Sequence, residues 1–196
     1  MNRDNFLYCE LPQFESCTEE LRTWFQSKIP NIDFWQSPFT FFDLEEFNQG
    51  CAKFKNTCDQ HDCEASHIVM YGIQPGRVQP ENEVPHTDHS IHNCLGLNFS
   101  IQNCAGTHTG MYDVIKGEKV LTELPNGVTY WKYNDDCEFT EITRFDLSKP
   151  TLFNTHIPHR VVNPGDNVRI SASIRFKLDP WHLTTGSNSV TINKKG

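Results

Sequence analysis

Pro85-His86-Thr87-Asp88 is the stretch that decides how this sequence is interpreted. In an extended strand the side chains alternate between two faces, so His86 and Asp88 point the same way with about 7 Å between their Cα atoms. An imidazole and a carboxylate that face one point supply two of the three ligands in a two-histidine, one-carboxylate iron(II) site. A polar loop before a strand would explain the same residues, because a single His-x-Asp often occurs by chance.

The segment 158–176 supplies the second half of the pattern, as a strand, a turn and another strand. In the second of these strands one face is apolar (Ile170, Ala172, Ile174, Phe176) and the other is polar (Arg169, Ser171, Ser173, Arg175). A solvated outer face is the usual explanation of such alternation. The alternative is a barrel with a polar interior and an apolar outside covered by helices. Arg169 and Ser171 would then hold a carboxylate by charge-assisted contacts.

His86-x-Asp88, His159 and Arg169-x-Ser171 occur in an order that resembles the iron(II)- and 2-oxoglutarate-dependent dioxygenases. The resemblance covers about residues 67 to 177. It implies a mostly β fold with supporting helices and a double-stranded β-helix (jelly-roll, cupin-like) core. His159 follows His86 by 73 residues, which leaves room for the intervening core strands. The short chain also resembles the minimal single-domain oxygenases of bacteria and their phages.

The resemblance implies a role for each site residue. Iron(II) would be held by three catalytic ligands, His86, Asp88 and His159. The cosubstrate 2-oxoglutarate would be bound by Arg169 and Ser171, with Tyr71 and Asn98 adding contacts from earlier strands and Tyr112 as a weaker candidate. His156 competes with His159 as the third ligand. His159 is favoured because its His-Arg-Val context and the ten-residue step to Arg169 fit the family.

The implied reaction is hydroxylation of a C–H bond with O2, releasing succinate and carbon dioxide. Asp88 favours hydroxylation, demethylation or desaturation over halogenation, because related halogenases have a small residue at this position. One alternative is a non-catalytic metal-binding jelly roll, and another is a zinc or iron cupin enzyme that does not use 2-oxoglutarate. Arg169 with Ser171 argues against both, since neither needs a carboxylate anchor inside the barrel.

Composition limits the remaining possibilities. The chain has 196 residues, which predicts one domain, and its formal net charge of −8 argues against nucleic acid as a partner. It has no apolar run long enough to span a bilayer and no signal peptide, so we expect a cytoplasmic protein with no membrane contact. The substrate would be a small molecule or a protein side chain.

Eight cysteines are expected to be free thiols in a reducing compartment. Cys58-x4-Cys63, with His61 and His67 close by, invites a zinc site as well. Structural zinc sites usually bring a second pair of ligands, and none is evident here. Buried or surface thiols are therefore the alternative that we favour for these cysteines.

The order of elements predicts a helical support at about 1–66, the jelly-roll core at about 67–177 and a loose polar tail at about 178–196. The expected helices run from a Ser16–Glu19 capping box to Ile29, and from 44 to 58 after Asp43. The aromatic stretch 31–42 reads as irregular. Strands are expected at 6–9, 67–73, 94–101, 109–114 and 138–147, with a hairpin at 118–133 around Pro125-Asn126-Gly127, and residues 151–154 lead into a corner at 156–159. The loop 75–85, that hairpin and His92 would lie near the mouth of the site.

Overall fold

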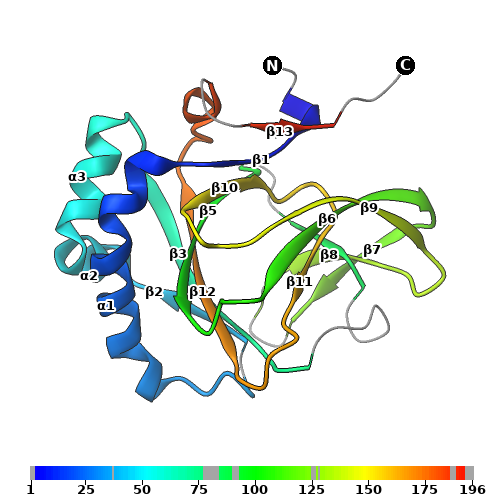
Figure 1. Ribbon diagram of the computed structural model, residues 1–196, viewed down its shortest axis with the longest axis horizontal. Helices are drawn as coiled ribbons and strands as arrows, with labels where there is room; N and C mark the ends of the chain where they lie inside the picture. The colour runs from blue at the N-terminus through cyan, green and yellow to red at the C-terminus, as the bar shows by residue number, and fades with distance from the viewer. Residues whose placement is uncertain are drawn as a thin grey trace.

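The computed structural model describes residues 3–36, 38–76, 84–89, 93–124, 127, 129–185 and 189–192 (Figure 1). Within these residues the chain forms two antiparallel sheets and a layer of helices. The larger sheet has seven strands in the order β13-β1-β10-β5-β12-β3-β2, and the smaller has six in the order β7-β8-β4-β11-β6-β9.

The strand bounds follow the predicted segments closely. The larger sheet contains β1 (Phe6–Glu10), β2 (Phe39–Phe42), β3 (Ala65–Ile73), β5 (Leu95–Gln102), β10 (Thr151–Asn154), β12 (Arg169–Phe176) and β13 (Val190–Thr191). The smaller sheet contains β4 (His86–Asp88), β6 (His108–Lys116), β7 (Lys119–Glu123), β8 (Thr129–Tyr133), β9 (Glu138–Phe145) and β11 (His159–Val162). The helices are α1 (Thr18–Lys28), α2 (Leu44–Gly50) and α3 (Ala52–Gln60), and short 3-10 helices occur at Arg3–Asn5, Pro12–Cys17, Ile29–Asn31 and Trp181–Thr184.

The path of the chain between the sheets is that of a jelly roll. From β3 to β6 each strand lies in the opposite sheet from the one before it, and the same alternation returns from β9 to β12. The four central strands of the larger sheet therefore face four strands of the smaller one, as in a double-stranded β-helix. This confirms the predicted fold class. The β7–β8 hairpin is an addition that extends the smaller sheet beyond β4.

The three helices cover the outer face of the larger sheet (Figure 1). Alternate residues of β5 and β12 on that face are fully or almost fully buried in one apolar core with the helices: Leu95, Leu97, Phe99, Ile101, Ile170, Ala172, Ile174 and Phe176. The opposite faces of the same strands carry the polar residues. The alternation in 169–176 therefore belongs to a barrel that is polar inside and apolar outside.

The helices differ from the prediction in two details. The expected single helix 44–58 is two helices, because the backbone at Cys51 leaves helical geometry with φ −127° and ψ 56°. Gly50, just before this break, lies so close to Trp24 that a Cβ atom would sit 2.1 Å from the indole Nε1. Asp43 caps α2, because its carboxylate accepts a hydrogen bond from the Glu46 amide at 2.8 Å. The predicted Ser16 capping box is wrong, since α1 begins after a 3-10 turn with no side-chain cap.

Two segments predicted to be irregular belong to the larger sheet. Residues 39–42 form β2, which pairs with β3 at its edge. The tail contains a 3-10 helix with Leu183 and Thr184 buried, and β13 pairs with β1 from the other end of the chain. The helical support thus also contributes strands, and the expectation of a loose tail is wrong for the residues described there.

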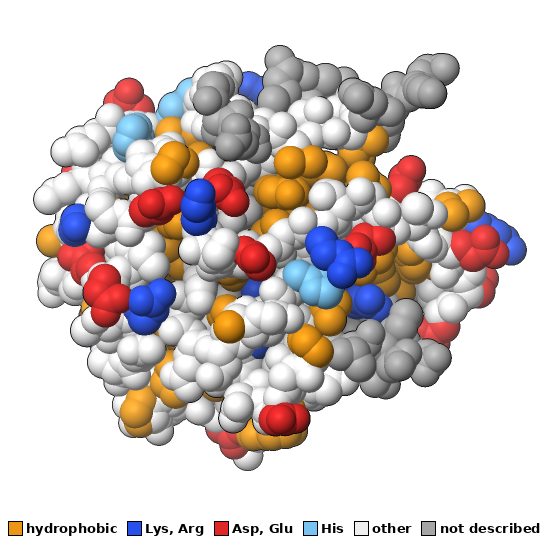
Figure 2. Space-filling view, viewed as in Figure 1, with side chains coloured by type: hydrophobic (Ala, Val, Ile, Leu, Met, Phe, Trp, Pro, Cys, Tyr) orange, Lys and Arg blue, Asp and Glu red, His pale blue; other side chains and the backbone are white. Residues whose placement is uncertain are grey.

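All eight cysteines are free thiols. The Cys63 thiol donates to the Cys58 carbonyl at 3.5 Å, and the two belong to no cluster of three or more metal ligands in the described part of the chain. No described helix is both long and apolar enough to cross a membrane. On the face shown in Figure 2, lysine and arginine side chains are scattered among acidic ones. Most of the loop 75–85, the turn residues Pro125 and Asn126, and His92 lie outside the described residues.

Candidate metal centre

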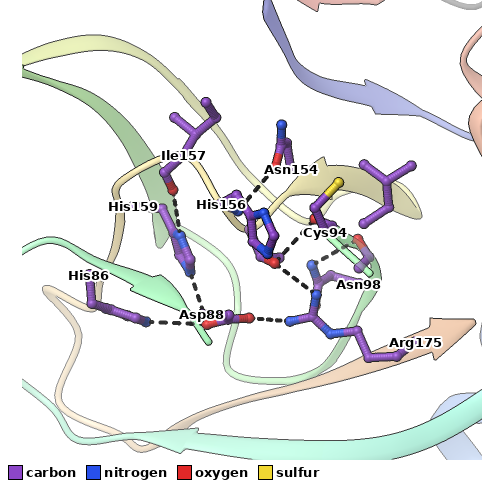
Figure 3. A network of polar contacts seen from close by, with 12 residues as sticks. His86, Asp88, Cys94, Asn98, Asn154, His156, Ile157, His159 and Arg175 are labelled. Atoms are coloured by element: carbon purple, nitrogen blue, oxygen red, sulfur yellow. Dashed lines mark hydrogen bonds and ion pairs between the residues drawn. The ribbon is translucent and has the colours of Figure 1, made fainter. Parts of the chain in front are cut away.

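His86, Asp88 and His159 meet inside the barrel as the sequence predicts (Figure 3). Strands β4 and β11 are neighbours, and His159 pairs directly with His86, so the two side chains lie on one face. The Nε2 atoms of both histidines lie 3.9 Å from Oδ1 of Asp88, and one potential ligand atom from each residue lies within 4.8 Å of the others. These separations suit three ligands around a single divalent ion, two of them imidazoles and one a carboxylate.

His159 is oriented by the backbone. Its Nδ1 lies 2.9 Å from the Ile157 carbonyl oxygen, which leaves Nε2 to face Asp88. A hydrogen bond from the second ring nitrogen is the usual way in which proteins fix the tautomer of a metal-binding histidine. The ring is 5% exposed and packs edge-on against Phe153 with 5.1 Å between centroids. His159 is therefore held in one geometry before any ion is bound.

Asp88 is held by Arg175, a contact that the sequence analysis did not identify. The guanidinium donates through Nη2 to Oδ2 of Asp88 and through Nη1 to the Thr155 hydroxyl at 3.0 Å (Figure 3). Oδ2 is thus engaged, while Oδ1 faces the two histidines. Parity along β12 placed Arg175 inside the barrel, but its partner depends on how the two sheets pack, for which the sequence has no local signal.

The charges of the site favour the forms that bind metal. Burial alone would raise the pKa of the Asp88 carboxyl, but the charges of Arg175, His159 and His86 outweigh it and hold that pKa below its usual value. Burial lowers the pKa of the His159 imidazole, against the opposing influence of Asp88. A deprotonated carboxylate and a neutral imidazole are the protonation states that bind a cation.

Tyr71, Asn98 and Ser173 line the inner wall beside Arg175. Burial raises the pKa of the Tyr71 hydroxyl, which contacts the side chains of Arg175 and Ser173. The Asn98 amide reaches the Gly96 carbonyl at 3.5 Å, so Asn98 lies inside the barrel without touching the His–Asp–His group directly. Gly96 leaves room for Arg175, because a Cβ there would lie 2.9 Å from Nη1.

Arg169 occupies the other end of the same face of β12. It is 2% exposed, and its Nε donates to the Thr107 hydroxyl at 2.9 Å while Nη1 donates to the Ser171 hydroxyl at 3.2 Å. Burial lowers the pKa of this guanidinium against the opposing influence of the Cys104 side chain, which it contacts, and no carboxylate of the described residues pairs with it. Arg169 and Ser171 are therefore together as predicted, and Thr107 joins them.

Three further side chains lie away from this site. His156 is exposed and belongs to no metal-ligand group in the described residues, so His159 completes the group. Tyr112 lies on the outer face of the smaller sheet, where its hydroxyl donates to Glu141 at 3.2 Å and its ring faces Arg160, so it is wrong as an inner contact. His89 points away from the group, toward Thr129 at 2.9 Å.

Comparisons with known proteins add little to this geometry. No protein-family model matches the chain, and no curated protein matches its sequence. The structure is similar to the crystal structure of AviO1 from Streptomyces viridochromogenes Tue57, with 9% sequence identity over 88% of this chain and 90% of that chain and a TM-score of 0.40. A likeness this distant says nothing of a shared activity.

Proposed function

We propose that this protein is an iron(II)- and 2-oxoglutarate-dependent oxygenase that hydroxylates a C–H bond of its substrate. His86, Asp88 and His159 would hold the iron, and Arg169 with Ser171 and Thr107 would hold the far carboxylate of 2-oxoglutarate. The observation that carries the proposal is the buried guanidinium of Arg169, which has no carboxylate partner in the described residues although it faces the same barrel interior as the metal group.

A buried charge without a counter-ion is costly. Hydroxyl partners satisfy some of the guanidinium donors of Arg169, but they do not neutralise its charge. A dicarboxylate ligand would supply the missing anion at this end and leave its other end free for the metal. A metal-storage or structural jelly roll has no need of such a group, so the unpaired arginine favours a cosubstrate.

The metal group leaves room for further ligands. Three protein ligands that approach an octahedral ion from one side leave three adjacent positions open. Because Arg175 engages Oδ2 of Asp88, only Oδ1 is directed toward the histidines, which preserves those positions. Bound together, iron(II), 2-oxoglutarate and O2 would supply an oxidant for C–H bonds, with succinate and carbon dioxide as products. The residues of the chain orient these groups and exclude water.

The substrate would be a small molecule or a protein side chain, and the protein would act in the cytoplasm. The mixed surface charge and the formal net charge of −8 agree with a partner other than nucleic acid. The carboxylate at Asp88 favours hydroxylation over halogenation, since it occupies the position that a halide would need.

The test is to add iron(II) and 2-oxoglutarate to the metal-free protein without oxygen and to record the visible charge-transfer band of the chelate. We expect a band that is absent from His159→Ala and retained in His156→Ala, which changes an exposed histidine three residues away. A folded protein that binds iron but gives no band would instead be a metal-binding jelly roll or a cupin that does not use 2-oxoglutarate.

A further inference from the structure

Both sheets continue past the metal group on the same side of the molecule. Arg175 of β12 and Tyr71 of β3 approach Asp88 of β4, so β3 and β4 face each other across the barrel. Beyond β3 the larger sheet adds β2, and beyond β4 the smaller sheet adds β8 and β7 (Figure 1). The inner faces of these added strands are therefore the next surfaces that a molecule at the metal would meet.

The added strands of the smaller sheet place Tyr130 and Lys132 beside the metal ligands. Lys132 pairs directly with His86 and Tyr130 with Asp88, so the paired side chains share a face. The Tyr130 ring lies edge-on to His86 with 5.7 Å between centroids. Val120 and Thr122 continue this face onto β7, which lies about 10 Å from β4 at the usual strand spacing.

The added strand of the larger sheet contributes an aromatic wall. Phe39 pairs with Tyr71, which faces the barrel interior, and the two rings lie edge to face with 5.0 Å between centroids. Phe41 is on the same face and is 53% exposed. By contrast Phe42 points to the other side, where it packs against Trp24 in the helical layer with 5.2 Å between centroids. An exposed phenylalanine next to the site, rather than against the helices, favours contact with a ligand.

Lys132 is the basic side chain on this face of the hairpin. Lys132 forms no ion pair with any described residue, and it lines a small cavity of about 130 Å³ together with Val120, Thr122, Tyr133, Asn134 and the acidic Asp135. Within β7 and β8 the other residues of this face are Val120, Thr122 and Tyr130. Lys119, on the opposite face of the same hairpin, lies over the Trp131 ring at 5.0 Å and so already has a partner.

We propose that the substrate binds between the inner faces of β2 and the β7–β8 hairpin, and that it combines a flat apolar body with one negatively charged group. The body packs against Phe41 and Tyr130, and the anionic group pairs with Lys132. That this molecule is the substrate rests on the proposed oxygenase function. The expected binding of an aromatic anion at Phe41, Tyr130 and Lys132 does not.

The probes are 3-phenylpropionate, its neutral amide 3-phenylpropanamide and the cation 2-phenylethylammonium. Binding is measured by ligand-observed saturation-transfer NMR on the full chain loaded with zinc(II), a diamagnetic substitute for iron(II), with and without 2-oxoglutarate. We expect the carboxylate to bind most tightly and the cation least. Lys132→Gln should weaken 3-phenylpropionate about fivefold and leave the amide unchanged. Phe41→Ala should weaken both about fivefold.

Two control variants lie on the opposite face of the hairpin. Lys119→Gln removes the same charge, and Leu121→Ala removes an apolar side chain that is 45% exposed, so neither should alter probe binding. The proposal is wrong if no probe binds, if the amide binds as tightly as the carboxylate, or if Lys119→Gln is as damaging as Lys132→Gln. Displacement of 3-phenylpropionate by 2-oxoglutarate would also overturn it, because the probe would then lie on Arg169. If the probes bind as expected but the wild-type protein gives no charge-transfer band with iron(II) and 2-oxoglutarate, only the proposed oxygenase function is wrong.

Discussion

Arg169 and Arg175 lie on the same inner face of β12, six residues apart, and the structure gives them opposite surroundings. Arg175 is paired with Asp88 in the metal group, whereas Arg169 is buried among hydroxyls. About 20 Å of strand separates their Cα atoms. Arg175 fixes the orientation of Asp88, whereas Arg169 has no carboxylate partner among the described residues, and under the proposed function its charge would be neutralised by 2-oxoglutarate.

The largest effect is expected from removing the Asp88 carboxylate, which belongs to the metal group and also pairs with Arg175. Asp88→Ala takes away a metal ligand and also leaves Arg175 without its partner. We expect iron(II) affinity to fall by more than about 100-fold, which is the upper end for losing even an outer partner of a metal ligand. Anaerobic titration calorimetry measures this loss. Asp59→Ala, which removes an exposed carboxylate on α3, should bind iron normally, and unchanged iron binding in Asp88→Ala would remove Asp88 from the metal site.

Replacing the unpaired arginine should affect the cosubstrate and spare the metal. Arg169→Met keeps most of the side-chain volume and removes the charge. Because hydrogen bonds to charged groups contribute roughly 1.5–3 kcal/mol, 2-oxoglutarate affinity should fall about 10- to 100-fold while iron affinity stays the same. The charge-transfer band, titrated with 2-oxoglutarate, gives the affinity.

The same variant has a second consequence for stability. Arg169→Met removes an unpaired buried charge, so the metal-free protein should be as stable as the wild type or more stable. Urea unfolding at constant ionic strength measures this difference. A large loss of stability would mean that Arg169 is paired within the protein, and an unchanged 2-oxoglutarate affinity would exclude it as the carboxylate anchor.

Replacing Arg175 should have the opposite effect on stability from replacing Arg169. Arg175→Met leaves the Asp88 carboxylate without a counter-ion in the metal-free protein. The pair retains some solvent access, with the side chain of Asp88 28% exposed, so we expect a loss of about 2 kcal/mol, below the range for fully buried pairs. Thermal unfolding should show a midpoint lower by about 4–8 °C.

Metal provides the control for this variant. A bound divalent ion would neutralise the Asp88 carboxylate in place of the guanidinium, so the deficit of Arg175→Met should shrink when zinc(II) is added. An equal deficit with and without metal would mean that Arg175 acts only through packing.

The contrast between the arginines also shows what sequence can and cannot predict. Alternation along β12 correctly assigned both side chains to the inner face, because the period of a strand is a local property. The contact of Arg169 with Ser171, two residues on, follows from the same alternation, but Asp88 of β4 and Thr107, which precedes β6, are distant in the chain. Such pairings depend on how the sheets pack, and a single sequence has no local signal for them.

The same distinction explains the errors in the fold. Most core strands were predicted to within a few residues, since they alternate between apolar and polar faces, whereas 151–154, which is β10, was expected only to lead into a corner. In β2 the sequence FTFF is aromatic on both faces, because Phe39 and Phe41 face the site while Phe42 faces the helices. β13 has only two residues and pairs with β1 from the other end of the chain, so its strand character depends on a contact of very high sequence separation.

The smallest effect is expected from a substitution that displaces the Arg175 side chain without removing it. In Gly96→Ala the new Cβ would lie 2.9 Å from Nη1 of Arg175 and 3.1 Å from the Ser173 hydroxyl. The guanidinium must shift away from Thr155 and Asp88, and overpacking at such a site costs about 1 kcal/mol or somewhat more. Unfolding in urea measures this cost. The affinity for 2-oxoglutarate should not change, because Arg169 lies at the far end of the strand.

A double-mutant cycle shows whether that cost acts through Arg175. If the clash with the guanidinium is the cause, Gly96→Ala should cost little more once Arg175→Met has been made, since a thioether chain can move aside. Neighbouring residues that act on one contact give coupling energies of about 0.5–3 kcal/mol in such cycles. Strict additivity would mean that Gly96 is required for the backbone of β5 rather than for the arginine. The pairing of Arg175 with Asp88 would then not require a glycine on the neighbouring strand β5.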